Sequence, residues 1–252
     1  MNDKIYKEIT KKIASGKKLY WVLLDPDDFS DSEGALVAIE AQECGADAIL
    51  VGGSLMHTDH LDSFVKSLKE SITIPVILFP GDATQITGYA DGVLFLSLLS
   101  GRNPEFLIGE QLKGAPRIKR HNIEPIPTAY MLIESGTVTS VEFMSNTRPI
   151  PRDKAGIAAV HGLAAQYMGQ KLIYLEAGSG AKESVPLKVI GAVKSQVDIP
   201  VIVGGGIRDV KTAAEKIAAG ADILVTGNLL NGENGREVMR GIGELLSKKS
   251  VN

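Results

Sequence analysis

The chain has 252 residues, of which 44% are hydrophobic and 23% charged, and its formal net charge is −3 at pH 7. This composition is that of an ordinary globular protein, and the length is close to the roughly 250 residues of one complete (β/α)8 barrel. No basic run interleaved with aromatic residues occurs, so we expect no binding to nucleic acid. No apolar run approaches the roughly 20 residues that cross a bilayer, which argues against a transmembrane segment.

The polar N-terminal residues 1–18 lack the apolar core of a signal peptide. The single cysteine, Cys44, can form no disulfide within the chain and is expected to be a small buried side chain. Both observations favour a protein of the reducing cytoplasm.

Eight short apolar runs recur along the chain and alternate with longer amphipathic segments. Most of the runs are continuous rather than alternately apolar and polar, which is typical of parallel strands buried on both faces. We predict strands over residues 19–24, 48–51, 75–79, 92–96, 125–131, 171–175, 200–203 and 223–225. We predict an N-terminal helix and further helices over residues 32–44, 104–119, 153–168, 185–195, 210–219 and 235–247.

This order of elements predicts a single-domain (β/α)8 TIM barrel over residues 1–252, although a doubly wound sheet begins in the same way. Gly45-Ala46-Asp47 and Gly220-Ala221-Asp222 each end a helix just before a predicted strand. Ile74-Pro75-Val76 and Ile199-Pro200-Val201 each open a strand, with proline where no ladder donor is missed. The recurrence is a weak internal repeat, and ordinary αβ-loop chemistry explains it equally well.

The least regular segment, residues 133–152, follows the fifth predicted strand. A loop of this length is unusual in a compact domain and tends to be functional. In a barrel it would lie at the carboxyl ends of the strands, where lids and substrate walls belong.

Three glycine-rich segments follow the last three predicted strands, at residues 176–181, 204–208 and 226–228. Glycine lets backbone N–H groups approach an anion, and a following helix start adds partial positive charge. The loops after strands 7 and 8 are the recurrent phosphate site of TIM barrels. We therefore predict a phosphate cradle to which Ser179 adds a third wall; alternatively, the glycines only serve tight turns.

Glu176 stands at the end of the sixth predicted strand, beside this cradle. A carboxylate near a phosphate is electrostatically unfavourable unless it accepts a proton or binds a hydroxyl. Glu176 is therefore a candidate general base for a hydroxyl of a phosphorylated substrate, the alternative being an ion pair with a lysine or arginine. Tyr174 shares the same face of the strand and could hydrogen-bond the same ligand.

Polar residues also follow the first two predicted strands. Asp25 and Ser54 offer the hard oxygen ligands that Mg²⁺ accepts, and magnesium needs only one or two protein carboxylates when substrate phosphates complete its shell. On spacing alone, Asp25 and Asp27 could equally be turn residues around Pro26. His57 and His60 have no further histidine or cysteine near them and are expected to be rim residues rather than metal ligands.

Five motifs together resemble the geranylgeranylglyceryl phosphate synthases, a family that includes the bacterial heptaprenylglyceryl phosphate synthases. They are Leu24-Asp25-Pro26-Asp27, Val51-Gly52-Gly53-Ser54, Tyr174-Leu175-Glu176-Ala177-Gly178-Ser179-Gly180, Gly204-Gly205-Gly206-Ile207-Arg208 and Thr226-Gly227-Asn228. The resemblance spans nearly the whole chain, and the segment from Tyr174 to Gly180 is its most specific part. The length, the N-terminal helix and the loop after strand 5 resemble the second group of that family.

The resemblance implies a Mg²⁺-dependent prenyltransferase of ether phospholipid synthesis. It would join sn-glycerol 1-phosphate to a long polyprenyl diphosphate, such as geranylgeranyl diphosphate, through an ether at the sn-3 position. The resemblance makes Asp25 and Ser54 ligands of Mg²⁺ and Glu176 the base on the 3-hydroxyl. It assigns glycerol phosphate binding to Tyr174, Leu175, Glu176, Ala177, Gly178, Ser179, Gly180, Gly205, Gly206, Gly227 and Asn228. It also implies a homo-oligomer, dimer or hexamer, that touches the membrane surface transiently to exchange its prenyl substrate and product.

A polyprenyl chain would need a long apolar groove at the barrel mouth. Candidates at the exits of strands 4 and 5 are Leu96, Leu98, Leu99, Tyr130, Met131, Leu132 and Ile133. Burial stabilises by about 0.8 kcal/mol per CH2, so the groove length should control which chain is chosen. For any one of these residues, packing in the barrel core is the competing interpretation.

Two other functions are compatible with a phosphate-binding barrel. One is a sugar-phosphate isomerase or lyase of histidine or tryptophan biosynthesis, which shares the glycine-rich phosphate loops but needs no prenyl groove. The other is a non-catalytic sensor of glycerol phosphate, which needs neither a metal nor a base. Metal-dependent turnover separates the sensor from both enzymes.

Overall fold

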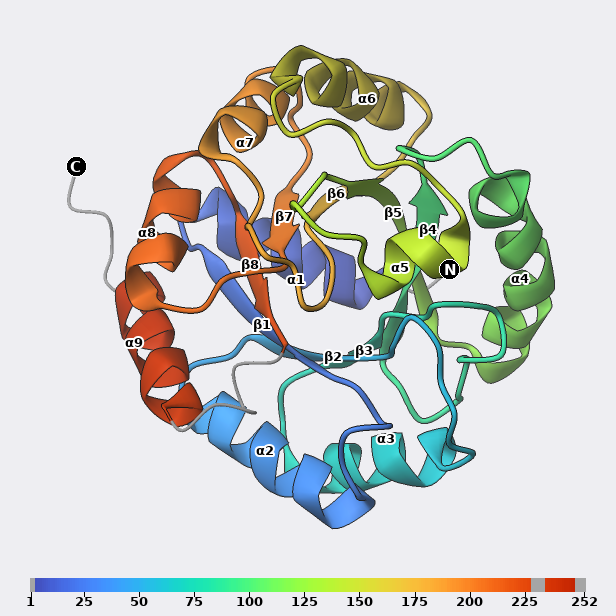
Figure 1. The fold of residues 1–252 in the computed structure, drawn as a ribbon. Coiled ribbons are helices and arrows are strands. Elements are labelled where there is room, and N and C mark those ends of the chain that lie inside the picture. Colours follow the sequence, from blue (N-terminus) through green and yellow to red (C-terminus); the bar gives the residue numbers. More distant parts are fainter. Residues whose placement is uncertain (1–2, 228–233, 248–252) are drawn as a thin grey trace.

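A computed structural model describes residues 3–227 and 234–247 of the chain. Its strands form a closed parallel barrel in which the order around the barrel is the order in the sequence (Figure 1), so the predicted TIM barrel is confirmed. The first and last strands close it, with Leu19 paired to Ile223 and Val22 to Thr226. The strands are β1 Leu19–Leu24, β2 Ala48–Val51, β3 Val76–Leu78, β4 Gly92–Leu98, β5 Glu124–Leu132, β6 Leu172–Glu176, β7 Val201–Gly204 and β8 Ile223–Thr226.

The helices surround this barrel (Figure 1). They are α1 Lys4–Ala14, α2 Asp31–Glu43, α3 Leu61–Ser71, the π-helix η1 Glu105–Gly109, α4 Glu110–His121, α5 Ser140–Ser145, α6 Ala155–Tyr167, α7 Leu187–Lys194, α8 Val210–Ala218 and α9 Gly235–Ser247. Helix α3 is absent from the predicted set, although its buried residues Leu61, Phe64, Val65 and Leu68 have the i, i+3, i+4, i+7 spacing of a helix. None of the helices in the described residues is long and apolar enough to span a membrane.

The core has two layers because successive residues of each strand face opposite sides of the barrel wall. One layer fills the barrel interior with bulky side chains such as Trp21, Leu50 and Tyr174. The other packs the outer wall against the helices, with Val22, Ile173 and Val203 among its members. The interior is thus a packed core rather than a pore, and only its ends are free for chemistry.

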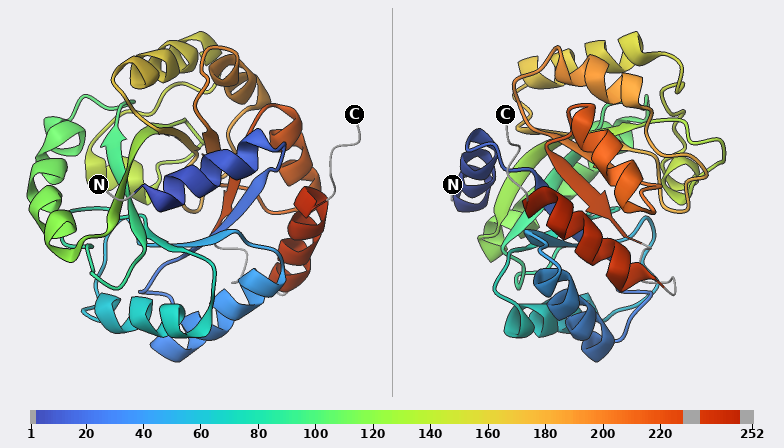
Figure 2. Two further views of the ribbon diagram at one scale, coloured as in Figure 1. Left: turned by 180° about the vertical axis from the view of Figure 1, so that it is seen from behind. Right: turned by 90° about the vertical axis from the view of Figure 1, so that its left-hand side faces the viewer.

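Helix α1 closes the amino-terminal end of the barrel. Ile5 and Ile9 pack against the interior layer, and the buried carboxylate of Glu124 on β5 accepts the N–H groups of Ile5 at 2.8 Å and Tyr6 at 2.9 Å. Glu124 therefore caps the N-terminus of α1, whose first N–H groups have no partner within the helix. Figure 2 shows α1 lying across this end, on the opposite side of the barrel from α5.

Aspartates at the starts of three even-numbered strands tie neighbouring strands together at the same end. Asp47 accepts the N–H of Tyr20 at 3.2 Å, Asp91 that of Val76 at 2.8 Å, and Asp222 that of Val201 at 3.0 Å. Each also binds lysine ammonium groups, for example Lys18 to Asp222 at 2.8 Å. The Gly-Ala-Asp repeat in the sequence therefore marks a repeated structural anchor.

The segment predicted as a long loop contains the short helix α5 and lies over the barrel mouth (Figure 1). A parallel bridge pairs Ile133 with Ile150 at its base, and Arg152 forms an ion pair with Glu183 at 2.5 Å. The N–H of Glu183 donates to the carbonyl of Ser135 at 3.0 Å. These contacts fix the segment against the loop that follows β6.

Removing the cap on α1 should weaken the fold without touching the mouth. We expect Glu124→Ala to lower the free energy of unfolding by about 2 kcal/mol, because two buried N–H groups lose their acceptor. Urea denaturation measures the change. Glu8→Ala, an exposed change on the same helix, is the control, and equal effects of the two substitutions would contradict the capping role.

Candidate active site

A cavity of about 1350 Å³ opens among the carboxyl ends of the strands. Its walls come from the loops after most of the strands, together with η1, α4 and α5. Of the predicted site residues, those lining it are Asp25, Ser54, Tyr174, Glu176, Gly178, Ser179, Gly180, Gly205, Gly206 and Gly227. Leu175 and Ala177 are buried in the layer beneath the helices instead, because their side chains point away from the mouth. Asn228 lies outside the described residues.

The glycine loops allow two side chains of β6 to lie close to β7. A Cβ atom at Gly204 would lie 2.5 Å from the Tyr174 hydroxyl, and one at Gly205 would collide with Oε1 of Glu176. Gly205 also has a φ of +80°, a conformation that other residues rarely adopt. Both positions require glycine, so these residues serve the packing around Glu176 as well as the backbone turn.

Glu176 is a buried carboxylate that lies beside the Tyr174 hydroxyl and has no basic partner among the described residues. Its side chain faces the mouth from the end of β6, the residue is only 6% exposed, and Oε1 accepts the N–H of Gly178 at 2.6 Å. Within the described residues no ion pair joins it to a lysine or arginine, so the alternative of a barrel ion pair does not hold for them. Burial raises the pKa of Glu176 to about 7, although the hydrogen bond from Gly178 opposes the rise.

The Tyr174 side chain lies beside Glu176, as predicted from the strand periodicity. Its ring stacks on Phe79, with centroids 5.0 Å apart, and meets Tyr130 edge-on at 5.5 Å. The buried hydroxyl has no well-aligned hydrogen-bond partner among the described residues, and neither has that of Thr139, which packs on Gly178. Buried hydroxyls are normally paired, so a polar ligand between β6 and α5 would complete the site.

Asp25 and Ser54 line the opposite side of the cavity. The Asp25 carboxylate rests against Gly53, where a Cβ atom would collide with Oδ2. Its only hydrogen bond among the described residues is from the N–H of Asp27 at 3.1 Å, and burial raises its pKa to about 6. Asp25 therefore does form a turn, yet one oxygen stays available to a cation.

The donor set fits a hard cation that brings most of its own shell. No cluster of three or more His, Cys, Asp or Glu side chains within the described ranges could hold a metal alone. One carboxylate and one hydroxyl are what Mg²⁺ requires when a substrate diphosphate and water supply the remaining oxygens. Asp25 and Ser54 would be its protein ligands.

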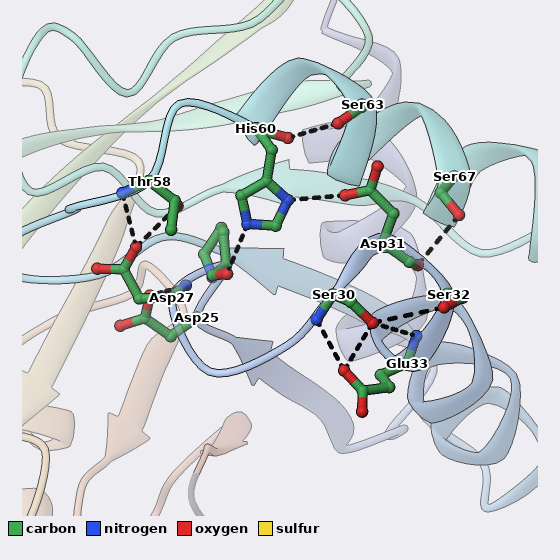
Figure 3. A network of polar contacts seen from close by, with 11 residues as sticks. Asp25, Asp27, Ser30, Asp31, Ser32, Glu33, Thr58, His60, Ser63 and Ser67 are labelled. Carbon is green, nitrogen blue, oxygen red and sulfur yellow. Dashed lines mark hydrogen bonds and ion pairs between the residues drawn. The ribbon is translucent and has the colours of Figure 1, made fainter.

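A polar network joins the two loops that carry these residues (Figure 3). The Asp27 carboxylate, which does not line the cavity, accepts the N–H groups of His57 and Thr58 at 2.8 and 3.0 Å. His60 bridges the Asp31 carboxylate at 2.7 Å and the Pro26 carbonyl at 2.9 Å. His60 is thus a structural link between the loops, a role that its place in the sequence did not indicate.

Much of the remaining wall is apolar. Leu96, Leu98 and Tyr130 line the cavity as predicted for a prenyl groove, whereas Leu99, Met131, Leu132 and Ile133 do not. Met131 and Ile133 face the helices, and Leu132 is buried in the barrel interior. Apolar residues that the sequence pattern did not indicate replace them, namely Phe106 on η1 and Val138, Val141, Phe143 and Met144 in or beside α5. For the residues in or beside α5, the clue in the sequence is an apolar series within the segment expected to be an irregular loop.

Arg208 brings positive charge to the cavity wall. Its Nη2 donates to the carbonyl of Ala181 at 2.6 Å, which holds the guanidinium on the loop after β6. The side chain forms no ion pair with Glu176, although the two groups line the same cavity.

The model of the PcrB family matches residues 11–245. The chain belongs to the PcrB family. The geranylgeranylglyceryl phosphate synthase of Thermococcus kodakarensis is 51% identical over 215 residues, 85% of this chain and 84% of the relative. That of Chitinophaga pinensis is 44% identical over 233 residues, 92% of each protein. With such relatives, this PcrB-family chain is an enzyme, a prenyltransferase of lipid biosynthesis, as predicted.

Solved structures agree with the family assignment. The crystal structure of (S)-3-O-geranylgeranylglyceryl phosphate synthase from Thermoplasma acidophilum, in complex with substrate sn-glycerol-1-phosphate, has a TM-score of 0.91 and 36% identity, covering 98% of this chain and 99% of that one. A thiamine phosphate pyrophosphorylase from Pyrococcus furiosus, at a TM-score of 0.57 and 16% identity over 91% of this chain and 97% of its own, shares the fold alone.

The burial of Glu176 should make stability depend on pH. The pKa of this carboxyl is about 7 when folded and about 4.5 when unfolded, so the folded state holds its proton more tightly and loses stability as the pH rises towards 7. Between pH 5 and 8 the free energy of unfolding of the wild type should fall by roughly 2–3 kcal/mol more than that of Glu176→Gln, which has no carboxyl group to ionise at this position. Urea denaturation of ligand-free protein at both pH values measures this. The exposed control Glu237→Gln should show the same pH dependence of unfolding free energy as the wild type. If Glu176→Gln shows that same pH dependence, the raised pKa of Glu176 is disproved.

Proposed function

We propose that this enzyme transfers a polyprenyl group from its diphosphate to the 3-hydroxyl of sn-glycerol 1-phosphate, with Mg²⁺ as cofactor. The observation that carries the proposal is the buried Glu176 carboxylate, which has no basic partner among the described residues and lies between a glycine cradle and an apolar cavity wall. The names of the relatives, and the glycerol phosphate in the Thermoplasma acidophilum complex, support the choice of substrates.

The glycerol phosphate would bind at the glycine loops after β6, β7 and β8. Gly178, Gly205 and Gly206 have positive φ values, and the N–H groups of such loops can converge on an anion. The Tyr174 hydroxyl is placed to hydrogen-bond the glycerol, which would give this buried group a partner. This arrangement leaves the 3-hydroxyl of the glycerol directed at Glu176.

The proton of that hydroxyl would pass to Glu176. A base with a pKa near 7 is ionised in about half of the molecules at neutral pH and still binds a proton strongly enough to assist the transfer. The new bond forms between O3 of glycerol and C1 of the prenyl group, and the bond from C1 to the diphosphate oxygen breaks. The diphosphate leaves with the electron pair, and Glu176 holds the proton.

The diphosphate would lie at the other side of the mouth, beside Asp25 and Ser54. Bound Mg²⁺ would neutralise charge on the leaving diphosphate and so favour cleavage of the allylic C–O bond. Asp25 contributes the protein's negative charge to that site, and Gly53 lets its carboxylate approach the loop of Ser54.

The prenyl chain would lie along the apolar walls formed by β4, η1 and α5. Leu96, Phe106 and Phe143 belong to this surface, and such a surface can shield a long hydrocarbon from water. This apolar surface and the names of the relatives support a long donor such as geranylgeranyl diphosphate. Exposed apolar side chains elsewhere, such as Tyr167 at 78% exposure on α6, support self-association into a homo-oligomer. A cytoplasmic enzyme of this kind would exchange its prenyl substrate and product at the membrane surface.

The decisive experiment uses radiolabelled sn-glycerol 1-phosphate with prenyl diphosphates of increasing length, each with Mg²⁺ and with chelator. Mg²⁺-dependent passage of label into the organic phase is expected, with a long donor best. The enantiomer sn-glycerol 3-phosphate is the control substrate. Tight binding of glycerol phosphate without transfer from any donor would refute the proposal and favour a sensor.

Loss of the base should separate binding from turnover. We expect Glu176→Gln to lower kcat by roughly 10²–10⁴ while the Kd for sn-glycerol 1-phosphate changes little, because the amide keeps the shape and the hydrogen bond from Gly178 but accepts no proton. Single-turnover rates and calorimetric titration measure the two quantities. Turnover near the wild-type value would exclude Glu176 as the base.

Loss of the metal ligand should act at the diphosphate end. We expect Asp25→Asn to raise the Mg²⁺ concentration for half-maximal activity at least tenfold and to weaken binding of the prenyl diphosphate, with glycerol phosphate binding unchanged. Metal titrations of the reaction rate test this. A variant that changes only thermal stability would make Asp25 a turn residue alone.

A further inference from the structure

The acidic residues after β1 divide into two kinds by what their oxygens contact. Asp25 lines the cavity with an oxygen available, whereas both oxygens of Asp27 are occupied by the neighbouring loop. Oδ2 of Asp27 accepts the N–H of His57 at 2.8 Å, and Oδ1 accepts the N–H and the hydroxyl of Thr58 at 3.0 and 2.8 Å. A carboxylate with so many donors has little capacity left for a cation.

These bonds join segments that the sequence places far apart. Asp27 belongs to the loop between β1 and α2, and its partners lie 30 and 31 residues further on, between β2 and α3. The two loops carry Asp25 and Ser54 just beyond neighbouring strands, which pair in register from Trp21 with Ala48 to Leu24 with Val51. The strands align the loop bases, but nothing in the strand pairing fixes the loops beyond them.

A second bridge from the same loop supports the first. His60 contacts Asp31 and the Pro26 carbonyl, so Pro26, the residue between the two aspartates, is also held from the β2–α3 side (Figure 3). The ring of His60 packs edge-on against Phe64 of α3, with centroids 5.7 Å apart. Asp27 of the β1–α2 loop therefore binds the β2–α3 loop, and His60 of the β2–α3 loop binds Pro26 and Asp31 on the other side.

We propose that Asp27 is a positioning residue, which anchors the loop of residues 54–60 and thereby holds Ser54 beside Asp25, and that it is not itself a metal ligand. This inference rests on the proposed function only in that Asp25 and Ser54 bind the cation. Charge-assisted hydrogen bonds to backbone N–H groups are among the stronger polar contacts in proteins, which suits an anchor. Without it, the β2–α3 loop keeps the contacts of His60 with Asp31 and Pro26 but loses its anchor at residues 57 and 58, so Ser54 is held less firmly.

The test compares Asp27→Ala, Asp27→Asn and the control Asp59→Asn. Asp59 is an exposed acid on the β2–α3 loop that Asp27 anchors, so its substitution removes the same charge without removing a contact that the structure describes. The readouts are the Kd for Mn²⁺, a spectroscopic substitute for Mg²⁺, measured with inorganic diphosphate present to complete the metal shell, the Kd for sn-glycerol 1-phosphate, and hydrogen exchange at the His57 and Thr58 amides.

We expect Asp27→Ala to weaken Mn²⁺ binding about tenfold and to accelerate exchange at both amides, with glycerol phosphate binding within twofold of wild type. Asp27→Asn should recover part of the Mn²⁺ affinity, because its carbonyl can still accept the Thr58 N–H whereas its amide nitrogen cannot accept that of His57, and Asp59→Asn should resemble wild type. Two results would overturn the proposal. One is weaker Mn²⁺ binding in Asp27→Asn with exchange at both amides as slow as in wild type, which makes Asp27 a ligand; the other is unchanged Mn²⁺ affinity in Asp27→Ala despite faster exchange. Because these readouts need no turnover, they stay decisive even if prenyl transfer fails.

Discussion

The site depends on keeping one carboxylate, Glu176, buried with no lysine or arginine of the described residues paired to it. A buried charge of this kind costs free energy, and the surrounding structure limits that cost chiefly through the N–H of Gly178. Gly204 and Gly205 at the end of β7 leave room for it, and the buried Tyr174 side chain lies beside it. The pKa near 7 that results is the property that the proposed general base needs, and on that proposal the fold gives up part of its stability to obtain a reactive group.

The rest of the barrel supplies the rigidity that this arrangement requires. Stability resides at the amino-terminal end, where Glu124 caps α1 and Asp47, Asp91 and Asp222 bind strand N–H groups and lysines. All of these carboxylates are engaged by several donors. The carboxyl-terminal end instead holds acids and hydroxyls with unused bonding capacity. The paired carboxylates at the amino-terminal end stabilise the barrel. This stability allows the other end to contain Glu176, whose burial costs free energy.

Much of this arrangement can be predicted from the sequence, for physical reasons. Buried parallel strands appear as continuous apolar runs, and the two-residue period of β6 places Tyr174 and Glu176 on one face of the strand. The same period explains why part of the predicted groove is wrong. The candidates at the end of β5 are consecutive residues, so alternate ones, Met131 and Ile133, face the helices instead of the cavity. The clamp of Asp27 on Thr58 and the walls of η1 and α5 arise from tertiary packing, which no local pattern encodes.

The division of the cavity has a consequence for how this enzyme can diversify. The polar end is built on β1, β2, β6, β7 and β8, whereas the apolar walls come from β4, η1 and the segment around α5. On the proposed function, a substitution at Phe106 or Phe143 would alter the space for hydrocarbon without touching Glu176, Asp25 or Ser54. Donor preference would then be a separable trait of the molecule, open to change by drift or selection in the apolar residues of β4, η1 and α5 while the chemistry on the opposite wall stays the same.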